Sequence, residues 1–224
     1  MILVESFAGG SAGDYHLHES PDEAQLTVRH YEIGMPALVL GSSQPYTDVD
    51  EDKCAYRGVE VVRRRSGGGA VLLVPGEHVW VDVWLPRGHR LWDDDVNRSS
   101  LWLGDAWVVT LGVALRGLEV HRDRLVGNAW SKKVCFSGRG PGEVFDDRGR
   151  KVVGISQRRD RAWARFQCIV SLSWNGRLLR ELLAEPKPSA EDVNDWGFEF
   201  EAGTPVPTAT ELASAFVTQA RQLS

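Results

Sequence analysis

The segment from Val61 to Leu73 constrains this chain more than any other part of its sequence. Three arginines, a serine and three glycines separate two apolar runs there. The apolar runs predict two strands, and the glycines predict a bare turn between them. Glycine can adopt positive φ and leave its N–H groups open to a ligand, and arginine supplies forked, permanently charged donors. The segment therefore indicates either a glycine-rich hairpin with solvated arginines or a site that binds oxyanions.

The spacing of these glycines separates the segment from two common phosphate-binding motifs. A Walker A loop continues with Lys-Ser or Lys-Thr after its last glycine, whereas Gly69 is followed by Ala70 and Val71. The Rossmann spacing is not met either, and a strand-like run follows the glycines instead of a helix. A different kind of phosphate-handling protein has to be considered.

Composition predicts one soluble domain. Of the 224 residues, 42% are hydrophobic and 25% are charged, which is enough to bury a sizeable core. The formal net charge of -5 argues against nucleic acid as the main partner, because binding to a phosphate backbone needs a basic excess. The sequence has neither a signal-peptide pattern at its start nor an apolar run of about 18 residues. We expect a cytoplasmic protein that does not enter a membrane, folded as a single domain over residues 1–224.

The spacing of cysteine and histidine indicates neither a disulfide framework nor a structural metal. Cys54, Cys135 and Cys168 are an odd number at wide spacing, which suits a reducing compartment. His16 and His18 form a His-x-His pair, but two histidines alone do not make a metal site. We expect these histidines to be packed or solvated, and we name no metal ligand.

Hydrophobic periodicity predicts an α+β fold, with a mixed, mainly antiparallel sheet flanked by helices. Besides the central hairpin, strands are expected at 2–4, 36–41, 79–85 and 166–174. Apolar residues about four apart predict a helix near 95–116, capped by Asp93 to Asp95 and ended by Gly117, and further helices are expected at 178–184 and 208–223. The glycines at 138–142 predict a flexible loop that could close over a ligand.

Three motifs in order resemble the lipoate-protein ligase A family, which also includes octanoyltransferases and is related to biotin ligases. The motifs are Leu40-Gly41-Ser42-Ser43-Gln44, the arginine-glycine run at 63–71, and Arg150-Lys151-Val152-Val153-Gly154-Ile155-Ser156-Gln157. The resemblance covers roughly residues 30–175, with about eighty residues between the last two motifs. It implies a biotin/lipoate-ligase-like catalytic domain, without the large C-terminal accessory domain of some ligases.

The resemblance also implies roles for individual residues. In the family, the glycine-rich hairpin lies against an acyl-adenylate, and a lysine at the position of Lys151 bonds the activated acyl group. The implied substrates are ATP with Mg²⁺ and lipoate or octanoate, and the implied partner is a lipoyl-carrier domain, with a separate accessory subunit as an open option. For Lys151 the alternative is a solvated cation at the end of a strand. The residues implied to bind the cofactor are Arg64, Ser66, Gly67, Gly68, Gly69, Gly154 and Ser156.

The sequence departs from the family pattern at three places. Leu73-Val74 and Gly76-Glu77 stand where the family has His-Asp and Gly-Asn, and Gln167-Cys168 stands where it has His-Gly. These departures leave the identity of the substrate open. They also keep open a non-catalytic member that binds an acyl cofactor or a partner protein without turnover.

Cys135 adds a second mechanism. A Cys-Phe pair lies sixteen residues before Lys151, as in one branch of the octanoyltransferases. The neighbouring Lys132 and Lys133 predict a thiol that ionises readily, because cations favour the thiolate, although a small buried hydrophobe is the alternative. Another branch has its cysteine where this chain has Ala164, which disfavours that route. Cys168 is expected in the core.

The ligase is the first hypothesis and the Cys135 thioester transferase is its rival. In the ligase, fixed main-chain N–H groups, Arg64 and Lys151 would meet the charge that develops at the α-phosphate of ATP. In either reaction Lys151 and Gly68 should adjoin one cleft, within about 10 Å of each other. We further expect that replacing Lys151 abolishes transfer and leaves the fold intact, as for an exposed cation.

Overall fold

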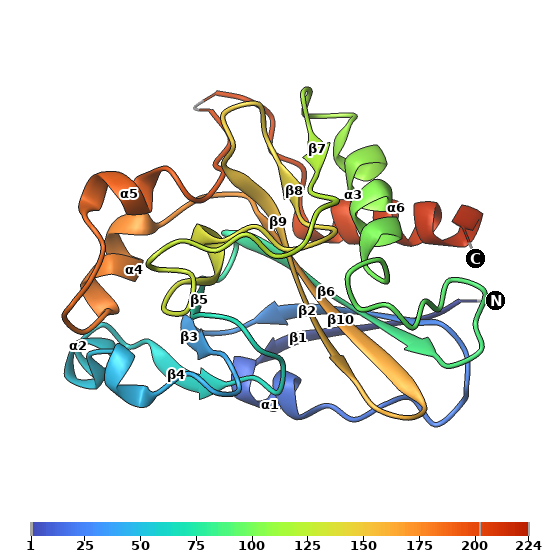
Figure 1. The fold of residues 1–224 in the computed structure, drawn as a ribbon, viewed down its shortest axis with the longest axis horizontal. Helices are drawn as coiled ribbons and strands as arrows, with labels where there is room; N and C mark the ends of the chain where they lie inside the picture. The colour runs from blue at the N-terminus through green and yellow to red at the C-terminus, as the bar shows by residue number, and fades with distance from the viewer. Residues whose placement is uncertain (1, 202, 224) are drawn as a thin grey trace.

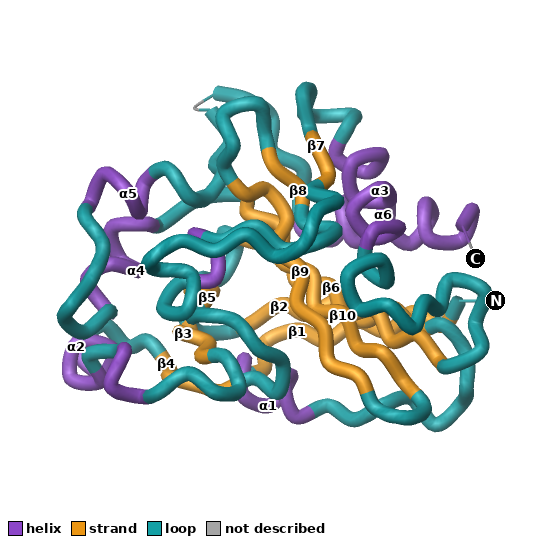
Figure 2. The backbone as a smooth tube through the Cα atoms, viewed as in Figure 1, coloured by secondary structure: helices purple, strands orange, loops and turns teal. Residues whose placement is uncertain are grey.

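A computed structural model describes residues 2–201 and 203–223 and shows a large sheet with a smaller sheet beside it (Figures 1 and 2). The large sheet has seven strands in the order β1-β2-β6-β10-β9-β8-β7. Only the β1–β2 pair is parallel. The expected mixed, mainly antiparallel α+β fold is therefore confirmed. The strands are β1 (Leu3–Gly10), β2 (Thr27–Ile33), β6 (His78–Pro86), β7 (Glu119–Val120), β8 (Val144–Phe145), β9 (Lys151–Arg159) and β10 (Trp163–Ser171).

The smaller sheet corrects the prediction of a central hairpin. Its order is β4-β3-β5, with β3 (Ala37–Leu40) between β4 (Glu60–Arg63) and β5 (Val71–Leu73). β3 pairs in parallel with β4 and antiparallel with β5. All four residues of β3 are buried and apolar, as expected for a central strand that is covered on both faces. The arginine-glycine segment thus crosses the end of β3 instead of turning between two paired strands.

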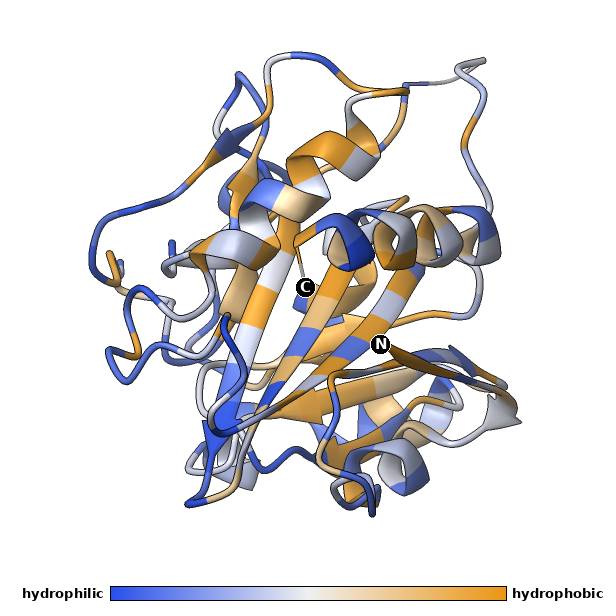
Figure 3. Ribbon diagram, turned by 90° about the vertical axis from the view of Figure 1, so that its right-hand side faces the viewer, coloured by the Kyte–Doolittle hydropathy of each residue, from blue (hydrophilic) through white to orange (hydrophobic). Residues whose placement is uncertain are grey.

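Two helices cover one face of the large sheet: α3 (Leu101–Leu111) and α6 (Ala209–Leu223). Their apolar residues join the alternate valines of β6 in one core cluster. Trp107 of α3 stacks on Phe216 of α6, with 4.3 Å between the ring centroids. Figure 3 shows strands beneath these helices in which hydrophobic residues alternate with hydrophilic ones, as side chains that point to opposite faces allow. The central strand β6 is nevertheless buried on both faces.

The helix expected near 95–116 is shorter than predicted. It begins after Ser100, because the aspartates form local turns instead of a first helical turn. Asp93 Oδ1 accepts from the Asp95 N–H, and Asp95 Oδ1 accepts from the Asn97 N–H. Such bonds compete with helix formation. The helix also ends earlier, at Gly112.

The remaining helices are short. The predicted helices at 178–184 and 208–223 are confirmed within two residues as α4 and α6. The polar stretch at 12–17, for which the sequence predicted no helix, is helix α1, capped by Ser11 Oγ, which accepts from the Asp14 N–H. No helix in residues 2–201 and 203–223 is long and apolar enough to cross a membrane. The short helices are α1 (Ala12–Leu17), α2 (Glu51–Tyr56), α4 (Gly176–Leu182) and α5 (Ala190–Asn194), with 3₁₀ turns at Tyr46–Asp48 and Cys135–Ser137.

Candidate functional site

The glycine loop, residues 64–70, is held from within by Arg64. The Arg64 side chain is buried, and its two terminal nitrogens donate to the carbonyl groups of Val39 at 3.0 Å, Gly67 at 2.7 Å and Gly69 at 2.9 Å. The sequence predicted a guanidinium free to bind a ligand oxyanion. In the structure it instead shapes the loop, because backbone carbonyls that point inward need donors.

The glycine loop packs closely against neighbouring backbone because glycine stands at the points of contact. A Cβ on Gly41 would lie 1.8 Å from the Gly68 carbonyl oxygen, and a Cβ on Gly69 would lie 2.6 Å from the Val134 nitrogen. Gly68 has φ of +100°, which side chains other than glycine rarely adopt. Gly41 and Gly69 are therefore required by space and Gly68 by backbone conformation.

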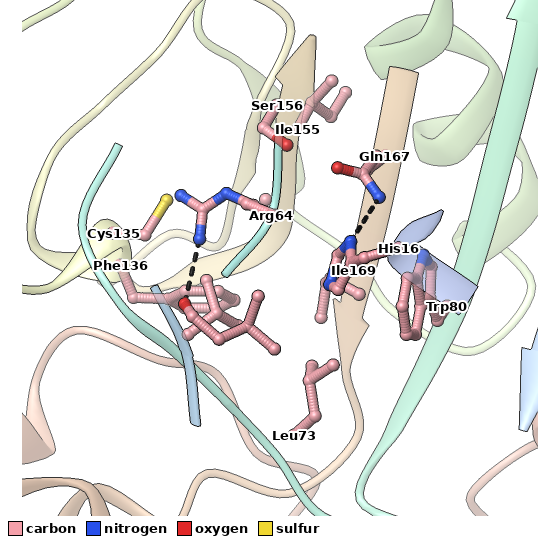
Figure 4. A pocket seen from close by; sticks show the side chains of 13 residues that line it. His16, Arg64, Leu73, Trp80, Cys135, Phe136, Ile155, Ser156, Gln167 and Ile169 are labelled. Atoms are coloured by element: carbon pink, nitrogen blue, oxygen red, sulfur yellow. Dashed lines mark hydrogen bonds between the residues drawn. The ribbon is translucent and has the colours of Figure 1, made fainter. Parts of the chain in front are cut away.

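The glycine loop is joined to the segment that carries Cys135. The Ala70 N–H donates to the Lys133 carbonyl at 2.9 Å, and the Cys135 N–H donates to the Ala70 carbonyl at 3.0 Å. These bonds place the half-buried Cys135 thiol beside the loop. A Cβ on Gly68 would lie 2.8 Å from Arg64 Nη2 and 3.6 Å from Cys135 Sγ. Figure 4 shows the sulfur directed toward the Arg64 guanidinium.

The cation beside the thiol is Arg64 and not Lys133. The Lys133 ammonium donates to the carbonyl groups of Ala184 and Pro186, each at 2.6 Å, so the prediction that it activates the thiol is wrong. Burial lowers the pKa of the Arg64 guanidinium from its ordinary value, and the negative charge of a Cys135 thiolate acts in the opposite direction. Arg64, held by the loop carbonyl groups, is therefore the cation that the sulfur faces (Figure 4).

Lys151, at the start of β9, is also buried, which corrects the alternative of a solvated strand-end cation. Its side chain is 1% exposed. The ammonium lies 2.7 Å from Glu143 Oε2 and donates to the Cys135 carbonyl at 3.0 Å. An ammonium has three donors, and these contacts use two of them within the described part of the chain. The third donor can serve a ligand in the cleft that Lys151 lines.

Glu143 is fixed as firmly as the lysine that it binds. Its carboxylate accepts from the Gly140 N–H at 2.6 Å and from the Ile155 N–H at 3.3 Å, and its side chain is 4% exposed. The glycine-rich stretch expected to be a flexible loop is thus anchored to the carboxylate through Gly140. Sequence reasoning missed Glu143, because nothing in its neighbourhood marks it as the partner of a lysine eight residues later.

A chain of buried polar side chains links the glycine loop to α1. Ser66 Oγ lies 3.0 Å from Ser156 Oγ and donates to Gln167 Oε1 at 3.1 Å. Gln167 Nε2 lies 3.1 Å from His16 Nδ1 (Figure 4). Burial, followed by the nearby cations Arg165 and Arg64, lowers the pKa of His16 to about 3, so the imidazole is neutral near pH 7. Its pair with His18 is packed as expected, since His18 Nδ1 bonds instead with the Tyr31 hydroxyl.

The site has a small apolar cavity and a larger open cleft. The apolar cavity has a volume of about 30 Å³, and the open cleft has a volume of about 950 Å³. Cys135, Ile155 and Ser156 line both, so the cavity and the cleft meet at these residues. The predicted site residues Gly67, Gly68, Gly69 and Lys151 line the cleft, while Arg64 and Gly154 line the cavity. Ser66 adjoins them through its bond to Ser156.

The departures from the family pattern fall in different places. Leu73 and Gln167 line the apolar cavity, and Glu77 lines a neighbouring cavity. Cys168 is in the core, as predicted, and burial raises the pKa of its thiol to about 12. The changes at Leu73 and Gln167 therefore alter the lining of the cavity and leave the lysine and the glycine loop in place.

The comparisons with known proteins identify the family. The chain belongs to the lipoyl protein ligase A/B catalytic domain family, whose model matches residues 11–196. It is similar to the octanoyltransferase LipM of Clostridioides difficile (strain 630), with 27% identity over 137 residues. That match covers 59% of this chain and 49% of the transferase, so the chain spans about half the length of this curated relative.

Solved structures show the same fold. A bipartite lipoate protein ligase of Thermoplasma acidophilum, studied with its E2 lipoyl domain, superposes with a TM-score of 0.72 at 15% identity, over 98% of this chain and 83% of that one. A lipoate-protein ligase A bound with ATP gives a TM-score of 0.71 at 15% identity, over 99% and 83%. LipL1 of P. falciparum in complex with lipoate gives 0.68 at 13% identity, over 99% and 62%.

Proposed function

We propose that this chain transfers a medium-chain acyl group, octanoyl or lipoyl, to a lysine of a lipoyl-carrier domain by way of a thioester on Cys135. The observation that supports it best is the position of the Cys135 sulfur, where the apolar cavity opens into the cleft. An acyl chain in the cavity would have its carbonyl carbon at this sulfur. The similarity to an octanoyltransferase and to a ligase studied with its E2 lipoyl domain supports the substrate and the partner.

The reaction proceeds in two balanced steps. In the first, the Cys135 thiolate attacks the carbonyl carbon of an acyl thioester, a carbon–sulfur bond forms, and the donor leaves as a thiol after taking up the proton that Cys135 gave up. In the second, the ε-amine of the carrier lysine attacks the new thioester and forms an amide. The Cys135 thiolate then leaves, and the proton lost by the amine restores the thiol.

The residues around the sulfur suit both steps. Each step passes through a tetrahedral oxyanion, which fixed donors stabilise. The third N–H of Lys151 is one such donor. The N–H groups of Gly67, Gly68 and Gly69 would be others, because these residues line the cleft with Cys135 and none of the three groups donates to an acceptor in the described part of the chain. Arg64 stabilises the thiolate that attacks and later leaves.

The ATP-dependent ligase is the second candidate, favoured by the size of the open cleft. At about 950 Å³ it is far larger than the apolar cavity, and it is lined by the glycine loop, the exposed Lys132 and Asp48. The free glycine N–H groups would face the phosphates, and Lys151 would face the acyl-phosphate. No group of three or more His, Cys, Asp or Glu suited to a metal occurs among residues 2–201 and 203–223. Nucleotide-bound Mg²⁺ takes its ligands mainly from phosphate and water with one or two carboxylates, a role that Asp48 could fill.

One pair of measurements separates these candidates. Incubation with an octanoyl-thioester carrier should add one octanoyl mass to the intact protein, and Cys135→Ala should abolish the adduct and the transfer to a lipoyl domain. Cys168→Ala is the matched control, because that cysteine lies in the core away from the cavity. Pyrophosphate release on mixing with ATP and lipoate, unaffected by Cys135→Ala, would instead establish the ligase. If the protein forms no acyl adduct and releases no pyrophosphate, it is a member of the family that binds without turnover.

A further inference from the structure

His16 is held rigidly at the wall of the apolar cavity. Arg165 donates to the carbonyl groups of His16 at 3.0 Å and Tyr15 at 2.9 Å, and it is paired with the buried Asp82 at 2.6 Å. The imidazole packs against Trp80, with 4.6 Å between the ring centroids. It is therefore a fixed part of the cavity lining (Figure 4).

The hydrogen bonds of Gln167 determine which ring nitrogen of His16 carries the proton. Ser66 donates to Gln167 Oε1, so the amide nitrogen Nε2 faces His16 Nδ1. An amide nitrogen is only a donor, and Nδ1 must therefore accept. Because the imidazole is neutral, its single proton resides on Nε2.

This Nε2–H group has no acceptor in the described part of the protein. The nitrogen is buried without a hydrogen-bond partner, in a side chain that lines the cavity. Arg64 Nε, in another residue of the same lining, is also buried without a partner. Two unmatched donors at one apolar cavity are costly, because a buried donor loses its bonds to water. A plain hydrocarbon chain in the cavity would leave both unmatched.

We propose that His16 is a specificity-determining residue that selects medium-chain acyl groups carrying a hydrogen-bond acceptor on the chain. A dithiolane sulfur and a hydroxyl oxygen both meet this description, and a saturated octanoyl chain does not. The proposal rests on the proposed acyl-transfer function, since it assumes that the acyl chain occupies the apolar cavity.

Binding of unreactive amides tests the proposal apart from catalysis. The full chain is titrated by calorimetry with octanamide, with lipoamide, and with octanamides hydroxylated at carbon 6 or carbon 8, where lipoamide has its sulfurs. The wild type should bind lipoamide or a hydroxyoctanamide at least about fivefold more tightly than octanamide. Preference for lipoamide alone identifies the dithiolane as the acceptor, and preference for a hydroxyoctanamide identifies oxygen.

Variants assign the preference to His16. In His16→Leu, the affinity for the functionalised amides should fall about fivefold or more relative to octanamide, so that the preference is lost. The reason is that a polar group would then enter the cavity without a donor. His16→Gln should retain it, because an amide nitrogen can replace Nε2–H. His18→Phe is the matched control and should leave it unchanged, since His18 bonds with Tyr31 and is not part of the cavity lining.

Two results would overturn the proposal, and they differ in meaning. If the wild type binds octanamide as tightly as every functionalised amide, His16 selects nothing, even if acyl transfer proceeds. If no amide binds while the thiol is still acylated, the chain does not occupy this cavity, and the proposal fails with its premise. Thermal unfolding of each variant shows whether it is folded. If His16→Leu is unstable, the preference of the wild type and the result for His16→Gln still test the proposal.

Discussion

Lys151 shows how far burial changes the meaning of a single residue. The sequence indicated an active-site lysine, which remains a prediction, but the expectation that its removal leaves the fold intact is wrong. Lys151→Ala leaves the Glu143 carboxylate buried without its cation, which costs about 3–5 kcal/mol of unfolding free energy. We predict loss of both acyl transfer and stability, measured by activity and by urea unfolding. Lys151→Met combined with Glu143→Gln should regain most of the stability and none of the activity; equal stability of wild type and Lys151→Ala would contradict this account.

Two buried histidines predict how stability depends on pH. Burial lowers the pKa of His16 to about 3 and of His78 to about 4, below the value of about 6.5 in an unfolded chain. Between these values the unfolded state binds more protons, so stability is complete above about pH 6.5 and falls as the pH decreases toward 4. Each histidine contributes a slope of up to about 1.4 kcal/mol per pH unit. Urea unfolding at pH 7, 6 and 5 measures it, and His16→Gln should reduce the slope; an identical slope in that variant would refute the assignment to His16.

Single residues were predicted where their chemistry is local and missed where it depends on distant partners. Cys135, Lys151 and the glycines could be singled out because each lies in a recognisable motif, and their roles remain predictions. His16 and Glu143 were missed because their roles come from contacts with Gln167 and Lys151, which the spacing along the chain does not reveal. The same limit explains Lys133, whose ammonium binds carbonyl groups about fifty residues away.

At the scale of elements, the glycine loop depends on close contact with the end of β3. Gly41→Ala would place a Cβ against the Gly68 carbonyl and displace the loop. We predict a loss of transfer of about 100-fold, because a shift of about 1 Å at a reacting centre has this effect. Gly67→Ala, in the same loop but with no atom within 4 Å of its new Cβ, is the matched control for close contact. Comparable activity in the two variants would show that the contact at Gly41 does not position the site.

Most elements could be predicted because hydrophobic alternation depends on neighbouring residues alone. β6, β10 and α6 lie close to their expected positions for this reason. The pairing of β4 and β5 could not be read in the same way, because the strand between them, β3, precedes both in the sequence. The predicted start of helix α3 was wrong for a local reason, because aspartate side chains that can cap a helix can also form turns.

At the scale of the whole molecule, the contact between α3 and α6 lies away from the apolar cavity. Phe216 stacks on Trp107 on the covered face of the large sheet and does not line the cavity. Phe216→Ala should lower the unfolding free energy by about 3–5 kcal/mol and leave transfer per folded molecule unchanged. Urea unfolding and activity at low temperature measure the two effects, with the exposed Val109→Ala as control. A large loss of activity in folded Phe216→Ala would show that the layers are coupled.

The junction between Ala70 and the Cys135 segment has a further consequence for how the molecule matures. It joins two stretches about 65 residues apart, so closing this long loop costs conformational entropy. Ala70 and Val134 are fully buried in one apolar cluster, so we expect the amides of this junction to exchange slowly. A maturing chain therefore brings its thiol and glycine loop together only when that cluster packs. Competence for chemistry and foldedness then arise in one population.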